Sequence, residues 1–556
     1  MTDHLTIALA QINPTVGALD HNAGLIRAAR AEAAAQGADL VVYPELSVCG
    51  YPPEDLVLKP FFLDKVEDTV KALAAETADG GPALLVGAPW RVDGKRHNAA
   101  LLLDGGAIAS IRLKYDLPNY GPFDEKRVFV PGPLPGPVNF RGVRLGVLVC
   151  EDMWTPDVTE TLAETGAEIL VVPNGSPFEI DKIDRRLELA VARVVETGLP
   201  LIYLNQVGGQ DELVFDGASF ALNADRSLVA QLPAFDSRLA ITRWTRGADG
   251  WTGSSNEMVA PPDALGAIYG AMVLGLRDYV AKNRFPGVLL GMSGGIDSAI
   301  SAAVAVDALG ADKVHCVMMP SPYTSQDSLD DAAECSALLG CRIDTISIGP
   351  AMEAFAGMLA PSFAGKQPDI TEENLQSRSR GVTLMALSNK FGSMVLSTGN
   401  KSEMSVGYAT LYGDMCGGYS VLKDVYKTTV YKLTHWRNQS RPDGALGPEG
   451  RVIPERIITK APTAELKPDQ KDQDTLPDYA ELDDILECLV ERDLSLHDIV
   501  ARGHDAQTVN RVWRMLDRAE YKRRQAPPGV KITSRSFGRD RRYPITSGLL
   551  SLVRGS

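Results

Sequence analysis

Short apolar runs alternate with longer segments of helical periodicity along most of the chain, and this alternation predicts an α/β protein. In the first half, apolar runs of six or seven residues end in polar or turn residues, as buried strands do. Between them, segments 22–36 and 185–197 place apolar residues three and four positions apart, which is typical of amphipathic helices. The expected strands of this half are 5–11, 39–44, 83–89, 144–150, 168–174 and 199–205.

The periodic pattern stops at residues 246–262, which are rich in glycine, serine and proline, and it resumes with a helical run over 264–283. We therefore expect one domain over 1–245, a linker over 246–262 and a second domain over 263–556. The apolar runs of the second domain lack strict alternation, as in a mostly parallel sheet covered on both faces. Residues 440–478, dense in proline and charge, should form a long loop that is functional or mobile. The expected strands here are 287–292, 313–320, 341–348 and 393–400.

Composition and charge narrow the class of protein. Of the 556 residues, 45% are hydrophobic and 23% charged, which fits a globular protein and neither a fibrous nor a disordered one. The net charge of -15 disfavours binding to a nucleic-acid backbone. Seven scattered cysteines form no CxxC pair, as in the reducing cytosol. The first ten residues show no secretory signal and the longest apolar runs are interrupted, so we expect a cytoplasmic protein with neither nucleic acid nor membrane as partner.

The segment 291–299, GMSGGIDSA, lies directly between an expected strand and a helical run. Glycines let backbone N–H groups wrap phosphate oxygens, and the following helix adds its positive N-terminal end. The alternative is a tight strand-to-helix turn in which aspartate and serine cap the helix. No Gly-Lys-Ser/Thr follows, so this is not a Walker A loop.

SGGIDS resembles the pyrophosphate loop of the ATP pyrophosphatases, enzymes that split ATP into AMP and pyrophosphate while they adenylate an acceptor. The resemblance implies ATP as co-substrate and a role for Asp297 in placing Mg²⁺. The residues that it assigns to the phosphates are Gly291, Ser293, Gly294, Gly295 and Ser298.

A second polar segment, STGNKSE at 397–403, follows another expected strand. In an open parallel sheet, ligand groups gather at the carboxyl ends of the strands. We therefore expect Thr398 and Glu403 to face the same crevice, with Glu403 as an oxygen ligand for Mg²⁺. Taken alone, a carboxylate such as Glu403 is more often solvated at the surface.

Three residues with potentially reactive side chains lie just past strands of the first half: Glu45, Lys114 and Cys150. A neutral thiol is a weak nucleophile, so a catalytic cysteine needs a neighbouring cation or base, and Lys114 and Glu45 supply both. The alternative for Cys150 is an inert buried strand residue, the commonest fate of free cysteine. With the flanks VVYPELSVCGY and LGVLVCEDMW, the set resembles the nitrilase superfamily, whose members cleave carbon-nitrogen bonds. This resemblance spans about residues 1–245 and implies an α-β-β-α sandwich.

By this resemblance Cys150 attacks the side-chain amide of glutamine, Glu45 relays the proton to ammonia, and Lys114 steadies the oxyanion. Glu125 matches the second glutamate of the superfamily, a positioning residue. The positions that match glutamine-binding residues of related glutaminase domains are Tyr120, Ser176 and Lys182.

An amide-cleaving half joined to an adenylating half implies that one half frees ammonia and the other makes a carboxylate able to accept it. Thr2 excludes the N-terminal nucleophile of asparagine synthetases, and Cys150 lacks the glycine-flanked elbow of GMP synthetases. The segments ENLQSRSRG, GNKSEMSVGYATLYGDMCGGYSVLKDVYKT, ITKAPTAELKPDQKDQDTLPDY and YKRRQAPPGVKI together resemble the glutamine-dependent NAD⁺ synthetases, which amidate deamido-NAD⁺. This resemblance covers almost the whole chain.

The resemblance assigns further residues of the second half to the two nucleotides. Thr398, Lys427 and Thr463 would bind ATP, and the residues assigned to deamido-NAD⁺ are Asn374, Arg378, Glu403 and Lys522. A dinucleotide carries two phosphate charges, which an acidic protein must meet with local cations. The alternative for the basic run at 522–524 is a solvated face. The family also implies a homo-oligomer formed through the synthetase domain.

Two other functions remain open at this point. The second half could adenylate another acid, which would make the chain a different glutamine-dependent amidoligase of the ATP-pyrophosphatase class. The whole chain could also be a non-catalytic regulator that senses ATP or NAD⁺. Segments such as APTAEL and YKRR speak against the first, and the intact Glu45, Lys114, Cys150 and Asp297 speak against the second.

Overall fold

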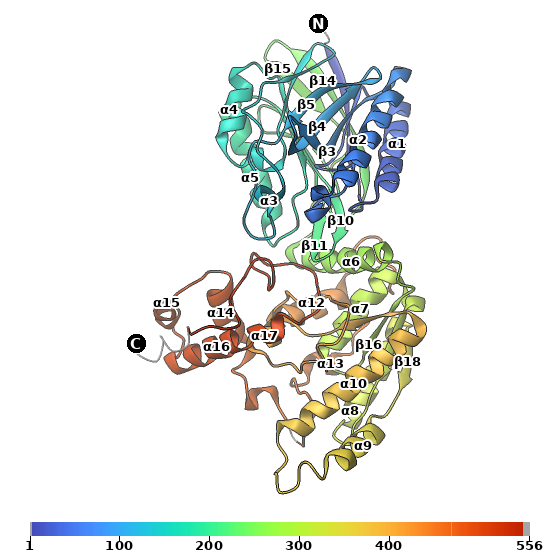
Figure 1. Cartoon of the computed structure of the whole chain (residues 1–556), viewed down its shortest axis with the longest axis vertical. Coiled ribbons are helices and arrows are strands. Elements are labelled where there is room, and N and C mark those ends of the chain that lie inside the picture. The colour runs from blue at the N-terminus through green and yellow to red at the C-terminus, as the bar shows by residue number, and fades with distance from the viewer. Residues whose placement is uncertain (1–2, 469, 549–556) are drawn as a thin grey trace. The chain divides into compact units, whose positions relative to one another are not determined.

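The computed structural model describes residues 3–468 and 470–548, and it divides the chain into two compact units, Met1–Asp263 and Ala264–Ser556. Figure 1 labels their helices and strands. Each unit is described by itself.

Unit 1 contains two large sheets and one two-stranded sheet within its described part. The first has seven strands in the order β15-β14-β1-β2-β3-β4-β5. Their bounds are β1 (His4–Gln11), β2 (Leu40–Val42), β3 (Ala83–Val92), β4 (Lys95–Asp104), β5 (Ala107–Leu113), β14 (Arg238–Gly247) and β15 (Gly250–Ser254). The second has six strands in the order β13-β12-β9-β8-β7-β6. Their bounds are β6 (Val138–Phe140), β7 (Val143–Val147), β8 (Ile169–Asn174), β9 (Leu201–Asn205), β12 (Phe220–Leu222) and β13 (Leu228–Gln231), and a separate hairpin joins β10 (Val207–Gln210) to β11 (Leu213–Asp216).

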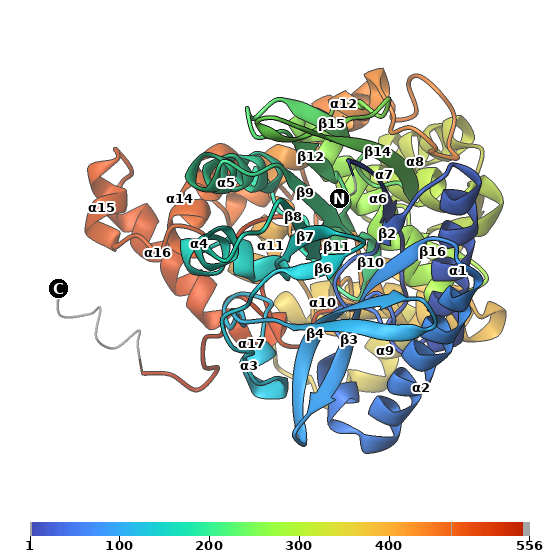
Figure 2. The ribbon, with the colours of Figure 1, turned by 90° about the horizontal axis from the view of Figure 1, so that it is seen from above.

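The two sheets face each other across an apolar core that includes Leu9, Val147 and Trp244. Helices α1 (Leu19–Ala35) and α2 (Pro60–Glu76) pack on the outer face of the first sheet, and α4 (Pro156–Glu164) and α5 (Lys182–Thr197) on that of the second. Figure 2 shows these two helix pairs on opposite sides of the strands. The short elements are α3 (Glu125–Val128), η1 (Glu54–Leu58), η2 (Thr77–Asp79) and η3 (Cys150–Met153). The predicted α-β-β-α sandwich is confirmed.

The segment expected to be a linker, 246–262, instead carries β15 and belongs to unit 1. β15 pairs antiparallel with β14, and its Trp251 is buried in the core between the sheets. Past this strand, the backbone of Gln231 accepts from Val259 N and donates to Glu257 O, both at 2.8 to 2.9 Å. This short strand contains glycine and serine around one buried tryptophan. Such a composition is typical of a turn, so the sequence alone does not reveal the strand.

Unit 2 is built on a five-stranded parallel sheet, counted over the described residues, in the order β18-β17-β16-β19-β20. The bounds are β16 (Val288–Gly291), β17 (Val314–Met318), β18 (Arg342–Thr345), β19 (Met394–Ser397) and β20 (Tyr419–Ser420). Every pairing is parallel, which confirms the prediction from unalternating apolar runs. Helix α7 (Ile296–Leu309) packs against β16 and β17, and α10 (Ile370–Phe391) packs against β16 and β19.

The remaining helices of unit 2 surround this sheet or form a C-terminal helical cluster with a core of its own around Leu482, Ile485 and Val512. Helix α6 is long and apolar enough to span a bilayer, but most of it is buried in the unit, as in a core helix. Over 440–468 and 470–478, the structure contains α13, η5 and otherwise irregular chain. The bounds are α6 (Ala264–Lys282), η4 (Ala311–Lys313), α8 (Gln326–Leu339), α9 (Gly349–Leu359), α11 (Lys401–Val406), α12 (Lys427–Gln439), α13 (Glu455–Thr459), η5 (Asp472–Asp474), α14 (Tyr479–Val490), α15 (Leu496–Ala501), α16 (Ala506–Arg518) and α17 (Glu520–Arg523).

Candidate functional site

The structure brings Glu45, Lys114 and Cys150 together in unit 1 from three separate strand ends. Glu45 follows β2, Lys114 follows β5, and Cys150 begins the turn η3 after β7. Lys114 Nζ donates to Glu45 Oε1 at 2.7 Å and to Glu125 Oε1 at 2.8 Å. All four side chains are buried, so the two ion pairs lie away from bulk water.

Cys150 has a left-handed backbone with φ of 49°, which is uncommon for a residue with a side chain. Such conformations gather at active sites, where the surrounding structure holds them. Asp152 helps to fix the backbone at Cys150. Its Oδ2 accepts a hydrogen bond from Val149 N at 3.0 Å, and its Oδ1 accepts one from Tyr115 N at 3.0 Å. One carboxylate thus ties the cysteine turn to the chain that directly follows Lys114.

The electrostatics of the cluster assign different charges to its members. Burial raises the pKa of the Cys150 thiol well above its ordinary value, Glu45 raises it further, and Lys114 opposes both. Burial works to lower the pKa of Lys114, but Glu125 and Glu45 together raise it well above its ordinary value. Lys114 is therefore a permanent cation, and Cys150 is a neutral thiol until a base takes its proton. The arrangement suits concerted deprotonation by Glu45.

Two residues that the sequence did not reveal complete this cluster. Asn98 Nδ2, on β4, donates to Glu45 Oε1 at 2.7 Å and to Glu125 Oε2 at 3.4 Å. Tyr51 OH donates to Glu125 Oε1 at 2.8 Å. Burial raises the pKa of Glu125 to about 7, while Lys114 and the Tyr51 hydroxyl lower it. A strand asparagine outside any motif gives no sequence signal.

The three residues assigned to glutamine lie around the turn and helix next to this cluster. Tyr120 OH donates to Glu151 Oε1 at 2.9 Å, directly beside Cys150 in the chain. Ser176 is buried, and its neighbour Gly175 donates its N–H to Glu45 Oε2 at 2.9 Å. Lys182 begins α5, with its ammonium 5.7 Å from the ring centre of Phe123.

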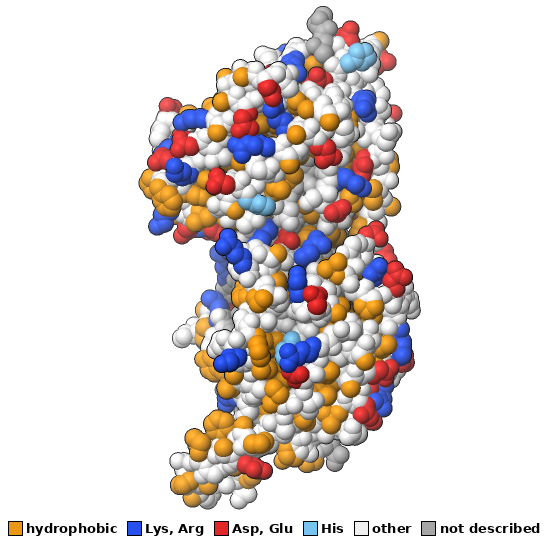
Figure 3. Space-filling view, turned by 90° about the vertical axis from the view of Figure 1, so that its right-hand side faces the viewer, with side chains coloured by type: hydrophobic (Ala, Val, Ile, Leu, Met, Phe, Trp, Pro, Cys, Tyr) orange, Lys and Arg blue, Asp and Glu red, His pale blue; other side chains and the backbone are white. Residues whose placement is uncertain are grey.

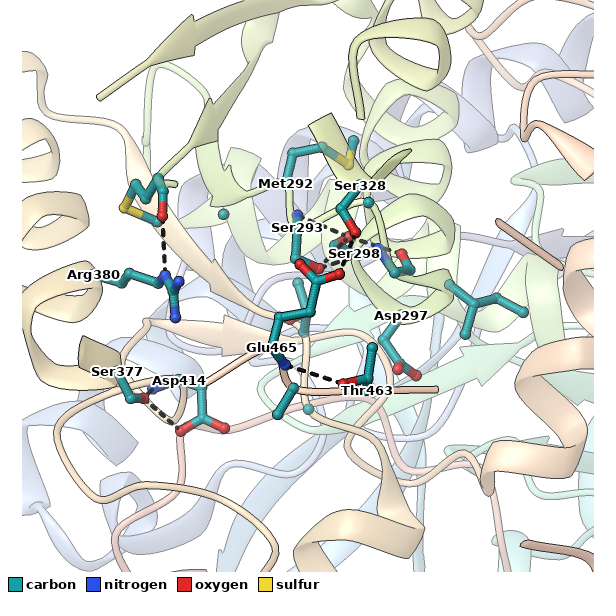
Figure 4. A pocket seen from close by; sticks show the side chains of 18 of the residues that line it. Met292, Ser293, Asp297, Ser298, Ser328, Ser377, Arg380, Asp414, Thr463 and Glu465 are labelled. Carbon is teal, nitrogen blue, oxygen red and sulfur yellow. Dashed lines mark hydrogen bonds between the residues drawn. The ribbon is translucent and has the colours of Figure 1, made fainter. Parts of the chain in front are cut away.

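A pocket of about 300 Å³ in unit 2 is lined by the loop between β16 and α7 (Figure 4). Gly294 in this loop has φ of 79°, and a Cβ there would lie 2.3 Å from Ser328 O, so only glycine fits. Ser298 Oγ accepts from Ser293 N at 3.3 Å and donates to Gly295 O at 2.9 Å, which keeps the loop closed on itself. The predicted residues that line the pocket are Gly291, Ser293, Gly294, Gly295, Asp297, Ser298, Thr398, Glu403, Lys427 and Thr463.

Asp297, Glu403 and Lys427 form an ion-paired group at one wall of this pocket. Lys427 Nζ contacts Asp297 Oδ2 and, at 3.2 Å, Glu403 Oε1. Asn400 Nδ2 donates to Asp297 Oδ1 at 3.0 Å. Burial raises the pKa of Glu403 to about 7, and Lys427 works to lower it. The described residues form no group of three His, Cys, Asp or Glu ligands, so a cation held by these two carboxylates needs further oxygens, such as those of phosphates.

Asn374, Arg378 and Lys522 are not among the lining residues of the pocket, as far as the structure describes them. All three hold the segment 407–411, which follows α11. Lys522 Nζ donates to Gly407 O at 2.7 Å and to Ala409 O at 2.6 Å, and Arg378 Nε donates to Leu411 O at 3.2 Å. Asn374 Oδ1 accepts from Thr410 Oγ1 at 3.0 Å. Their assignment to deamido-NAD⁺ stays a prediction.

The pocket also holds charged residues that were not predicted. Arg380 donates from Nε to Met319 O at 3.1 Å, and burial lowers its pKa. Asp414 accepts from Ser377 Oγ at 3.3 Å (Figure 4). Glu465 Oε1 accepts from Ser328 Oγ at 2.7 Å. Arg380 lies within the segment SRSRG and Glu465 within APTAEL. Their position inside these family-specific segments is the sequence feature that could have identified them as pocket residues.

The fold and the buried Glu-Lys-Cys cluster define unit 1 as a carbon-nitrogen hydrolase, and the parallel sheet with its phosphate loop defines unit 2 as a nucleotide-binding domain. Comparison with known families agrees. The Carbon-nitrogen hydrolase family matches residues 6–247, and the NAD synthase family matches residues 268–526.

Relatives that match over their full length assign the whole chain to one family. A glutamine-dependent NAD⁺ synthetase of Rhodobacter capsulatus is 52% identical, over 98% of this chain and 99% of its own. One of Acinetobacter baylyi is 45% identical, over 98% of each chain. The solved structure of the Acinetobacter baumannii glutamine-dependent NAD⁺ synthetase in complex with ADP is 43% identical, covers 98% of each chain and superposes with a TM-score of 0.78. The chain belongs to the glutamine-dependent NAD⁺ synthetases.

Proposed function

We propose that this chain hydrolyses glutamine to glutamate and ammonia in unit 1 and uses that ammonia in unit 2. There it adenylates the carboxylate of deamido-NAD⁺ with ATP and amidates it to NAD⁺, the final step of NAD⁺ biosynthesis. AMP and pyrophosphate are the other products. The observation that carries the proposal is the Lys114 contact with Glu45 and Glu125, beside Cys150, in one chain with a pocket lined by a pyrophosphate loop.

In unit 1, Glu45 takes the proton of the Cys150 thiol as the sulfur bonds to the amide carbon of glutamine. Lys114 stabilises the negative oxygen that forms, because it stays charged in a buried site. Glu45 then gives the proton to the departing nitrogen, which leaves as ammonia, and water splits the thioester to glutamate. Glu125 holds Lys114 in place, and Tyr120, Ser176 and Lys182 bind the remainder of glutamine.

Tyr51→Phe tests the role of Glu125. Loss of the O–H donor destabilises the carboxylate, so the pKa of Glu125 should rise above about 7. Ionised Glu125 is lost as pH falls through this pKa, so the acid limb of glutaminase kcat/KM should move about one pH unit upward. Tyr43→Phe, which removes a buried hydroxyl bonded to Ile26 O, is the control. An unshifted acid limb would contradict a catalytic requirement for ionised Glu125.

In unit 2, the backbone N–H groups of the loop at 291–298 and the N-terminus of α7 bind ATP phosphates. Lys427, Thr398 and Thr463 complete the ATP site. Asp297 and Glu403 fit Mg²⁺ because both are carboxylates at one wall of the pocket, and the ion would neutralise phosphate charge. The residues we assign to deamido-NAD⁺ are Asn374, Arg378, Glu403 and Lys522.

A coupled assay with deamido-NAD⁺, ATP, Mg²⁺ and glutamine tests the proposal. We expect NAD⁺, AMP and pyrophosphate in equal amounts with at least as much glutamate, and none of the first three without deamido-NAD⁺. Pyrophosphate release with a different acid, and none with deamido-NAD⁺, would identify another amidoligase of this class. No pyrophosphate with any acid would identify a nucleotide-binding regulator.

We also propose that the chain acts as a cytoplasmic homo-oligomer joined through unit 2. Seven free cysteines, with no disulfide among the described residues, support a reducing compartment. Hydrophobic side chains gather on the end of unit 2 that carries α9, at the bottom of Figure 3. An exposed apolar surface of this kind is typical of a protein interface. The most exposed hydrophobic side chains on α9 and α10 are Met358, Ile370 and Val382, each about two-thirds exposed.

Val382→Glu should convert the oligomer to smaller species, because a charge cannot be buried in an apolar interface without a partner. Sedimentation velocity measures the mass, and we expect glutamine hydrolysis to stay unchanged. Leu446→Glu, at an exposed leucine in the loop 440–478 of the same unit, is the control. An unchanged sedimentation coefficient for Val382→Glu would place the interface elsewhere.

A further inference from the structure

Arg186 on α5 is a buried cation with an unusual set of partners beside the glutaminase cluster. It is 2% exposed, and its Nη1 donates to both carboxylate oxygens of Asp216 at 2.8 Å. The rest of its guanidinium donates to one short segment: Nε to Ser176 Oγ at 3.1 Å, and Nη2 to Ser176 O at 2.8 Å and Pro177 O at 2.9 Å. Buried arginine with a full set of acceptors is a rigid anchor.

The segment that Arg186 holds also touches the catalytic cluster. Asn205 fixes its backbone from the other side, with Oδ1 accepting from Ser176 N at 2.9 Å and Nδ2 donating to Ser176 O at 3.0 Å. One residue earlier, Gly175 N donates to Glu45 Oε2 at 2.9 Å. A shift of this segment would therefore move a hydrogen-bond donor of the catalytic base and the Ser176 side chain together.

The chemistry of guanidinium gives the Ser176 hydroxyl a defined role. Guanidinium donates hydrogen bonds and accepts none, so Ser176 Oγ must act as the acceptor toward Arg186 Nε. The hydroxyl hydrogen is then donated to another acceptor: either the neighbouring Tyr203 hydroxyl, whose pKa the side-chain hydrogen bond with Ser176 works to lower, or an oxygen of bound substrate. Glutamine offers carboxylate and amide oxygens, both of which are acceptors. An unanchored serine would rotate between donor and acceptor states and would bind such an oxygen less often.

We propose that Arg186 is a positioning residue of the glutamine site, which orients the Ser176 hydroxyl as a donor to glutamine and holds Gly175 N on Glu45. The inference rests on the proposed function, because it gives Ser176 a substrate. Arg186 acts through Ser176 and Gly175 and does not touch the reacting atoms.

Arg186→Lys in the full chain tests the inference. Lysine keeps the charge beside Asp216, but one ammonium cannot serve Ser176 Oγ, Ser176 O and Pro177 O together. We expect the KM for glutamine to rise about tenfold, with kcat changed less and the ammonia-dependent rate unchanged. Arg193→Lys is the matched control, since Arg193 is also buried on α5 but pairs with Glu196. An unchanged KM in Arg186→Lys overturns the inference.

Alkylation of Cys150 separates positioning from a general structural role. Iodoacetamide has no α-carboxylate, whereas 6-diazo-5-oxo-L-norleucine has the whole glutamine backbone. Arg186→Lys should slow labelling of Cys150 by the second reagent about tenfold and by the first much less, because the first senses only the Gly175 contact with Glu45; mass spectrometry of the Cys150 peptide measures both rates. Equal slowing with both reagents would overturn the inference, because Arg186 would then support only the fold of the site.

Two more variants distinguish a wrong role for Arg186 from a wrong glutamine site. If Arg186→Lys does not fold, Asp216→Asn keeps an acceptor for Nη1 but loosens the guanidinium, and it should raise the KM for glutamine severalfold. An unchanged KM there would also overturn the inference. Ser176→Ala should raise the KM as Arg186→Lys does. If Ser176→Ala has no effect, the proposed glutamine site is wrong; if it has an effect and Arg186→Lys has none, only the role of Arg186 is wrong.

Discussion

Cys150→Ala is expected to abolish NAD⁺ formation from glutamine while NAD⁺ formation from added ammonium salt continues at the wild-type rate. The loss should exceed about a thousandfold, since no other group can form the thioester. Unit 2 should be unaffected, because every described residue that lines its pocket belongs to unit 2. The measurements are NAD⁺ production with each nitrogen donor and glutamate release.

The control for this variant is Cys49→Ala. Cys49 is also a buried free thiol, and burial raises its pKa, but it lies in the core and contacts the Gly50 carbonyl instead of the cation Lys114. It should keep glutamine-dependent activity. Equal loss with both nitrogen donors in Cys150→Ala would refute the division of labour between the units.

The elements that the sequence revealed are those that carry their own local signal. Glu45, Lys114 and Cys150 each follow a strand inside a specific motif. In the structure Lys114 bonds to Glu45, and both act electrostatically on the Cys150 thiol. The loop at 291–298 also carries a local signal, because backbone geometry requires glycine: Gly294 has no space for a side chain. The parallel sheet of unit 2 followed from its unbroken apolar runs.

The features that could not be predicted from the sequence depend on contacts between segments that are distant in the chain. Asn98 bonds to Glu45 across 53 residues and to Glu125 across 27, and nothing local distinguishes it from any polar residue in a strand. Arg186 resembles a surface residue of an amphipathic helix until the structure shows Asp216 beneath it. The composition of β15, in which glycine and serine dominate, predicts a linker, but pairing with β14 and burial of Trp251 make it a strand.

Asp297→Asn is the complementary variant, and it should lose NAD⁺ formation from both nitrogen donors by at least about a hundredfold. Asparagine keeps the shape of the side chain but removes the charge that pairs with Lys427 and that we assign to Mg²⁺. Glutamine hydrolysis in unit 1 should continue. Asp312→Asn, at an exposed aspartate just past α7, is the control and should behave as wild type. Full activity of Asp297→Asn would refute the nucleotide site.

Mixing Asp297→Asn with Cys150→Ala turns these two results into a test of how ammonia travels. The first variant makes ammonia that it cannot use, and the second uses ammonia that it cannot make. Free ammonia in neutral water is mostly protonated and so is a poor nucleophile, which favours transfer sheltered from solvent. We therefore expect the mixture, supplied with glutamine, to form NAD⁺ only at the rate that the accumulated ammonium supports in Cys150→Ala alone. Wild-type rates from the first turnover would show that ammonia reaches unit 2 through the solution.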